Sequence, residues 1–104
     1  MEEDIMLKIA KNVDGEKLTV ALEGRLDTTT APQLNDELKS ALDGITELVI
    51  DAETLEYISS AGLRVLLSAQ KSMAKKGSMV VKNVSEEVQE ILEVTGFIDI
   101  LTVQ

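Results

Sequence analysis

Cysteine and histidine are both absent from this chain of 104 residues, and each absence excludes a class of chemistry. Without cysteine there are no disulfides and no thiolate nucleophile. Without histidine there is no imidazole general base, no phosphohistidine relay and none of the usual zinc sites. No other nucleophile–base pair stands out, and the glycines do not form a phosphate-binding loop. We therefore expect a protein that is not an enzyme and that holds no metal or cofactor.

Aromatic residues and long apolar runs are also scarce. Tyr57 and Phe97 are the only aromatics, so the core must be aliphatic. No apolar stretch approaches the roughly 18 residues of a membrane-spanning helix. The opening segment "MEEDIMLKIA" is acidic and does not look like a signal peptide. The length suits one domain, which we place at residues 1–104, and we expect it in the cytoplasm.

Positive charge is outnumbered by negative charge. Ten Lys and Arg residues stand against nineteen Asp and Glu residues, for a formal net charge of −9. Such a chain is repelled by phosphate backbones and anionic lipid. The balance therefore argues against nucleic acid and membranes as partners and favours a basic protein partner.

Apolar periodicity alternates between strand and helix patterns. Ile5, Leu7 and Ile9 alternate with other residues, as do Leu18, Val20 and Leu22, and Asp14-Gly15 between them predicts a hairpin. The later segments take helix and strand in turn: helix 31–43, strand 48–50, helix 60–76, strand 79–81, helix 86–95 and strand 98–100. Strand–helix alternation requires crossover connections. The fold class expected is a small α/β domain, with a mostly parallel sheet, an antiparallel N-terminal edge strand and helices packed on it.

Two adjacent serines precede the helical pattern "AGLRVLL". Ser60 is predicted as the helix N-cap. A phosphate on Ser60 would face free N–H groups and the positive end of the helix dipole, and would add a charge of about −1.5 to −2. Ser59 is the competing acceptor, or a loop residue that bonds to backbone. Gly62 leaves the approach of a partner or kinase open. On pattern alone, the capping role is favoured over regulation.

Two aspartates follow apolar strand patterns. Asp27, in "GRLDTTT", falls in a loop at the same end of the sheet as Ser60, where ligands and partners usually bind. Equally, Asp27 would bond Thr29 or Thr30 in a local turn. Thr30 is expected to cap the next helix through its side chain. Asp51 ends "LVID", which raises a phosphoaspartate receiver as an alternative function, although "LEGRLD" lacks the acidic pair that a receiver needs.

Three motifs together resemble the bacterial anti-sigma factor antagonists, the STAS-domain family: "EGRLDTTTAPQL", "ISSAGLRVLL" and "VTGFIDIL". The resemblance implies a STAS fold that binds an anti-sigma factor, itself a serine kinase, and so frees a sigma factor and regulates transcription. It implies that the kinase phosphorylates the antagonist and abolishes binding, and that a serine phosphatase reverses this partner switching.

Aligned on Gly62 and the leucine after it, Ser60 is the residue that the resemblance implies is phosphorylated. Ser59 stands where the family usually has aspartate, and Asp27 matches the aspartate of the partner-binding loop. The implied docking surface comprises Asp27, Ser59, Ser60, Gly62 and a solvent stripe around Arg64 and Ser68. A STAS scaffold that is not phosphorylated is the remaining alternative.

Overall fold

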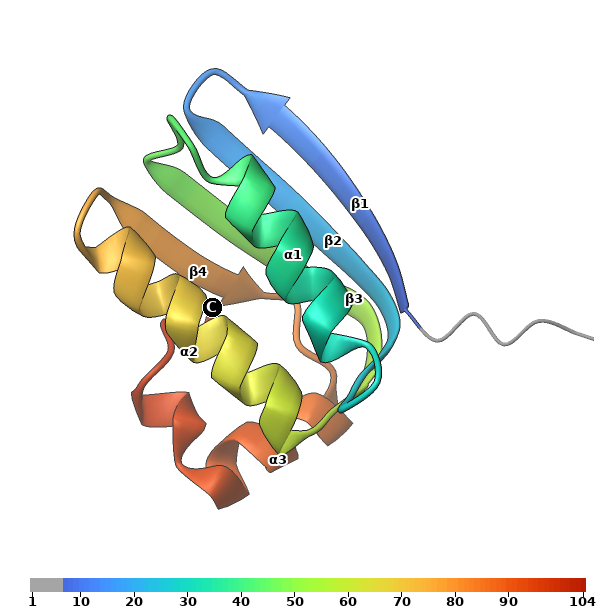
Figure 1. Ribbon diagram of the computed structural model, residues 1–104. Coiled ribbons are helices and arrows are strands. Elements are labelled where there is room, and N and C mark those ends of the chain that lie inside the picture. The colour runs from blue at the N-terminus through green and yellow to red at the C-terminus, as the bar shows by residue number, and fades with distance from the viewer. Residues whose placement is uncertain (1–6) are drawn as a thin grey trace, which may run out of the picture.

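The computed structural model describes residues 7–104, which form a four-stranded sheet, three α-helices and one 3-10 helix (Figure 1). The predicted N-terminal hairpin is confirmed. β1 (Leu7–Asp14) pairs antiparallel with β2 (Lys17–Leu26), and Gly15 makes the turn with a φ of +65°. Ile5, which the sequence also assigned to the first strand, lies outside the described residues.

The remaining strands are parallel, as expected. β3 (Glu47–Ile58) pairs with β2 on one side and with β4 (Ser78–Lys82) on the other, so the order is β1-β2-β3-β4 with β1 at an edge. β3 has 12 residues and β4 has five. The second half of β3 therefore continues beside β2 alone within this sheet, toward the end where α2 begins.

Helices α1 (Ala31–Ala41) and α2 (Ser60–Ala74) cross one face of the sheet side by side, and α3 (Glu86–Thr95) contacts β3 (Figure 1). Their apolar stripes meet those of the strands in one aliphatic cluster. Its helical members include Leu34, Leu38, Leu63, Leu66, Met73, Val88 and Leu92. Both aromatic side chains are only half-buried, which agrees with the expected aliphatic core. None of the described helices is long and apolar enough to cross a membrane.

The predicted strand at residues 98–100 is wrong. Gly96 ends α3 in the left-handed conformation, with a φ of +83°, and Phe97–Asp99 then form a 3-10 helix. The carbonyl of Phe97 accepts the N–H groups of Ile100 and Leu101, which holds the backbone in a turn rather than a strand. Only further on does the chain reach the sheet, where Val103 forms a single parallel bridge with Val81.

Candidate functional site

The loops that follow β2 and β3 lie together at one end of the sheet. Leu26 and Ile58 are register partners at the ends of these strands, and the N–H of Ser59 donates to the carbonyl of Leu26 at 2.9 Å. Asp27 follows Leu26 directly, and Ser60 follows Ser59. The expectation that Asp27 and Ser60 share one end of the sheet is therefore confirmed.

Asp27 organises the loop between β2 and α1. Its Oδ1 atom accepts bonds from the Thr29 hydroxyl at 2.8 Å, the Thr29 N–H at 3.0 Å and the Thr30 N–H at 3.2 Å. The Thr29 hydroxyl contributes most to holding the pKa of the Asp27 carboxyl below its ordinary value of 3.8; desolvation opposes it, and the backbone N–H groups reinforce it. The local turn predicted for Asp27 is present, in a loop that also lies beside Ser59.

Thr30 does not cap α1 in the predicted way. It occupies the N-cap position but makes no side-chain bond to the helix. Instead its buried hydroxyl donates to the carbonyl of Arg25 at 2.8 Å and accepts the N–H of Asp27 at 2.8 Å. The Thr30 hydroxyl thus bonds to the backbone of both Arg25 and Asp27, while the Asp27 side chain bonds to Thr29 and Thr30. These bonds together fix the shape of the loop.

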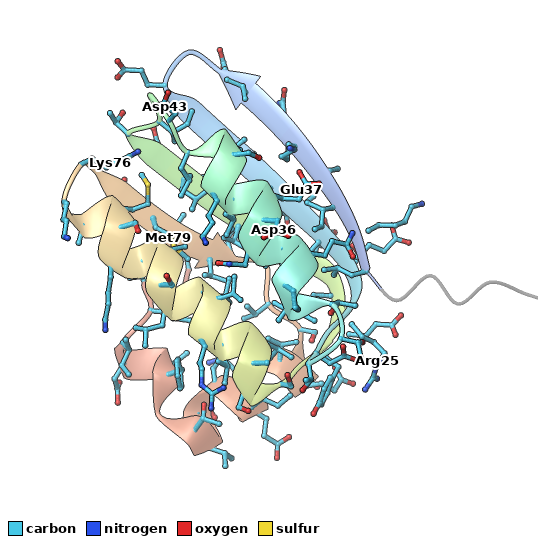
Figure 2. All side chains as sticks on the ribbon, viewed as in Figure 1. Arg25, Asp36, Glu37, Asp43, Lys76 and Met79 are labelled. Carbon is cyan, nitrogen blue, oxygen red and sulfur yellow. The ribbon has the colours of Figure 1, made fainter. Side chains whose placement is uncertain are left out.

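Arg25 and Tyr57 were not singled out from the sequence, yet they border the same loops. They are register partners on β2 and β3, and the Arg25 guanidinium lies 4.4 Å from the centre of the Tyr57 ring. The Arg25 Nε atom is also 3.8 Å from Asp27 Oδ2. Figure 2 shows Arg25 at this end of the sheet. Two features could have pointed to Arg25. It stands two residues before Asp27, and its register partner Tyr57 is one of only two aromatic residues in the sequence.

The structure places the two serines differently from the prediction. α2 begins at Ser60, and Ser59 holds the N-cap position, so the assignment of Ser60 as the cap is wrong. The Ser59 carbonyl accepts the N–H of Leu63 at 2.9 Å, but its side chain makes no capping bond. Its Oγ atom is buried and has no hydrogen-bond partner among the described residues. Ser60, by contrast, is exposed.

Gly62 is buried and does not open the surface to a partner, so that reason for including it in the docking surface is wrong. A Cβ atom at Gly62 would lie 2.6 Å from Leu26 Cγ and 3.0 Å from Ile58 Cγ1. The missing side chain instead lets the first turn of α2 pack directly onto the ends of β2 and β3. Gly62 therefore positions the serines from beneath.

Arg64 and Ser68 are exposed, as the solvent stripe predicted. They follow Ser60 at intervals of four residues, which places all three on one side of α2. Arg64 is thus one turn from Ser60, within the spacing at which side chains on a helix interact.

Asp51 does not end its strand, which removes the main premise of the receiver alternative. β3 continues for seven residues beyond it, to Ile58. The Asp51 Oδ1 atom accepts the side-chain amide of Asn83 at 3.0 Å and the N–H of Glu53 at 3.1 Å. Within residues 7–104, no three Asp, Glu, His or Cys side chains gather as a metal site. Asp51 has a structural role next to the end of β4.

Comparison with known proteins identifies the family. Residues 9–102 match the family model described as "Mlab, STAS domain". A putative anti-sigma factor antagonist, BtrV of Bordetella bronchiseptica, is 38% identical over 93 residues, which cover 88% of this chain and 79% of that protein. The anti-sigma-B factor antagonist of Listeria monocytogenes is 30% identical over 97 residues, covering 90% and 84%. The resemblance stated from the motifs is confirmed.

Solved structures confirm the fold. An anti-sigma factor antagonist from Mycobacterium paratuberculosis superposes with a TM-score of 0.86 at 20% identity, covering 99% of this chain and 89% of that one. The unphosphorylated form of the anti-sigma factor antagonist SpoIIAA gives a TM-score of 0.77 at 20% identity, covering 94% and 87%. Its phosphorylated form, from Bacillus, gives 0.70 at 19% identity, covering 94% and 90%.

Proposed function

This chain belongs to the STAS-domain family, and we propose that it is an anti-sigma factor antagonist switched by phosphorylation of Ser60. In its unphosphorylated form it binds an anti-sigma factor that is a serine kinase, and a sigma factor is freed to act in transcription. The kinase transfers phosphate to Ser60, which ends the complex, and a serine phosphatase restores binding. All of these steps take place in the cytoplasm.

One contrast carries the proposal: Ser60 is exposed at the first turn of α2, whereas the Ser59 Oγ atom is buried. A kinase must reach the hydroxyl that it phosphorylates, so the exposure favours Ser60 over its neighbour. The phosphate would also lie at the positive end of the α2 dipole, near N–H groups of the first helical turn. The site therefore tolerates phosphate without a change of fold.

The docking surface surrounds this serine. The Asp27 loop lies beside it through the bond from Ser59 to Leu26, and Arg64 and Ser68 extend it along α2. Asp27 is held ionised and in one position by bonds from Thr29 and Thr30. A fixed carboxylate suits recognition of a cationic side chain on the kinase. A phosphate at Ser60 adds a charge of about −1.5 to −2 within this surface, which changes its electrostatics and its shape.

The experiment that tests the site is phosphorylation by the cognate kinase with ATP, followed by peptide mass spectrometry. We expect one phosphate, on Ser60 in the wild type, and none in Ser60→Ala. The matched control is Ser59→Ala, which should still take up phosphate on Ser60. Full uptake by Ser60→Ala would show that the acceptor is elsewhere. No uptake by the wild type would leave the chain as a scaffold that is not phosphorylated.

Binding tests the switch itself. Ser60→Asp should bind the kinase at least about tenfold more weakly than the wild type, a difference of about 1.4 kcal/mol. Ser60→Ala removes the hydroxyl without adding charge, so it should keep most of the affinity. Equal affinity of Ser60→Asp and wild type would rule out release by negative charge at this position.

A further inference from the structure

The segment that contains α2 is positively charged, although the chain as a whole is acidic. Between Glu56 and Glu86 there is no acidic residue, yet this segment holds five of the ten Lys and Arg residues. α2 lies inside that segment. The local charge is thus opposite in sign to the net charge of −9. A net charge describes long-range attraction, whereas a docking partner meets the local surface.

Two cations of α2 and the lysine at its C-cap form one stripe that begins at Ser60. Arg64, Lys71 and Lys75 are exposed and repeat at helical spacing on the side of α2 that carries Ser60. From Ser60 to Lys75 the stripe is about 22 Å long, at 1.5 Å per residue. A surface of this length contributes substantially to a protein–protein interface of ordinary size, which buries roughly 800 Å² on each partner.

A groove between α1 and α2 lies next to this stripe. It has a volume of about 390 Å³ and shares Ser68 and Ser72 with the exposed side of α2. Its floor includes the buried side chains of Leu38 and Ala69. Lys39 and Lys76 also line the groove. Among the described residues that line it, Asp43 is the one with a carboxylate side chain.

Neither acidic residue of α1, Asp36 or Glu37, lines the groove. Glu37 is paired with Lys11 on β1, with 2.5 Å between the Lys11 Nζ atom and Glu37 Oε1. The Glu37 side chain therefore lies on the β1 side of α1, away from α2 and outside the groove. Figure 2 shows Asp43 beside Lys76, at the end of the groove far from Arg25 and the Ser60 loop.

We propose that the partner bound at Ser60 also presents an acidic segment, which lies along the α2 stripe and places apolar side chains in the α1–α2 groove. This inference rests on the proposed function and identifies the chemistry of the partner's surface. It replaces the basic partner that net charge favoured, for this face of the molecule. It also explains why a phosphate would act strongly here: a charge of about −2 offsets most of the three cations of the stripe.

Charge reversal with a matched control tests the stripe. Lys71→Glu reverses a charge on the stripe, and Lys8→Glu makes the same change in net charge on β1. Lys8 is exposed and alternates with Leu7 and Ile9, which pack toward the helices, so it lies on the opposite face of the sheet. The affinity of each variant for the kinase is measured by calorimetry, at about 0.05 M and about 0.5 M salt.

We expect Lys71→Glu to lower affinity about tenfold at the low salt concentration and Lys8→Glu to change it less than about twofold. The difference should shrink at the high salt concentration, because screening weakens the attraction. Equal losses in both variants would mean that only net charge matters and would overturn the inference. So would unchanged affinity in Lys71→Glu.

The groove has its own matched pair. Ser72→Trp fills it without changing charge, whereas Ser40→Trp places the same bulk on an exposed part of α1 that does not line the groove. Only Ser72→Trp should weaken kinase binding, by about fivefold or more. Equal affinities for the two variants would remove the groove from the interface.

The two proposals fail in distinguishable ways. If Ser60→Asp weakens binding while Lys71→Glu and Ser72→Trp do not, the Ser60 switch stands and the acidic partner segment is wrong. If the wild type does not bind the kinase, the proposed function fails first. Sedimentation velocity of the chain alone tests whether the stripe binds a second copy of this chain. Self-association that Lys71→Glu abolishes would assign the stripe to a second copy of this chain and overturn the inference.

Discussion

Gly62 packs directly against Leu26, and a Cβ atom on Gly62 would approach Leu26 Cγ to 2.6 Å. Because Leu26 Cγ is the branch point of a fully buried side chain, it cannot move aside freely. This contact joins the first turn of α2 to the end of β2, directly beneath the two serines. The position of the candidate phosphorylation site thus depends on a residue without a side chain.

Gly62→Ala should therefore destabilise the fold, although alanine is the better helix former. Overpacking costs about 1–3 kcal/mol, and helix propensity returns up to about 1 kcal/mol. We expect a net loss of about 1 kcal/mol in urea unfolding. A double-mutant cycle with Leu26→Ala checks the cause, because shortening Leu26 should make room for the new methyl group. Strictly additive losses would show that the two residues are not in contact.

Ser59 and Ser85 both occupy N-cap positions, but only one of them caps. Ser85 Oγ accepts the N–H of Val88 at 3.2 Å, whereas Ser59 Oγ has no partner among the described residues. Ser85→Ala should cost about 1 kcal/mol of unfolding free energy. Ser59→Ala should cost less than about 0.5 kcal/mol, because it removes a buried polar atom that makes no bond. Urea unfolding of the two variants compares them directly, and similar losses would contradict the assignment.

Asp27 should titrate below the ordinary aspartate value, because bonds from Thr29 and Thr30 stabilise its charged form. Its contribution to stability is present above the unfolded pKa and is lost as pH falls through the lower, folded pKa. Thr29→Val should raise the pKa of Asp27 toward the ordinary value, since the hydroxyl has the largest effect. NMR titration of the carboxyl carbon measures this shift. Thr28→Val is the control and should leave the titration unchanged.

The element order could be predicted from sequence because the apolar periods are long and regular. Leu18, Val20 and Leu22 alternate in β2, and Val88 and Leu92 share one side of α3, so the buried faces follow from spacing. The edge position of β1 followed from its hairpin with β2. The shared end of the Asp27 and Ser60 loops followed from the parallel arrangement of β2 and β3.

The errors lie where a long-range contact overrides local pattern. The sequence predicted that the strand ends at Asp51, because Asp51 closes the apolar run "LVID". In the structure a bulge places Ala52 and Glu53 opposite Leu22, and the Thr54 hydroxyl donates to the Leu22 carbonyl at 3.1 Å. The strand therefore continues with altered alternation. The sequence pattern contains no signal for that bulge.

The one-residue error at the start of α2 has a similar cause. Either serine suits an N-cap by type, so propensity does not choose between them. The choice is made by the bond from the Ser59 N–H to the Leu26 carbonyl, which extends the strand geometry by one residue. The alternation of Ile98 and Ile100 wrongly predicted a strand. The left-handed Gly96 turns the chain before a strand can form.

Phosphorylation of Ser60 should leave the fold intact or stabilise it, which separates release by surface charge from release by unfolding. Ser60 is the first residue of α2, where negative charge interacts favourably with the helix dipole. Arg64, one turn further along, is exposed and is positioned to pair with the phosphate. We expect the phosphorylated chain to gain about 0.3–1 kcal/mol in urea unfolding at low salt. Arg64→Gln should reduce this gain, while Lys8→Gln should not, since Lys8 is on a different element. If the phosphorylated chain unfolded at lower urea than the unmodified one, the loss of kinase binding would have to be attributed to damage of α2.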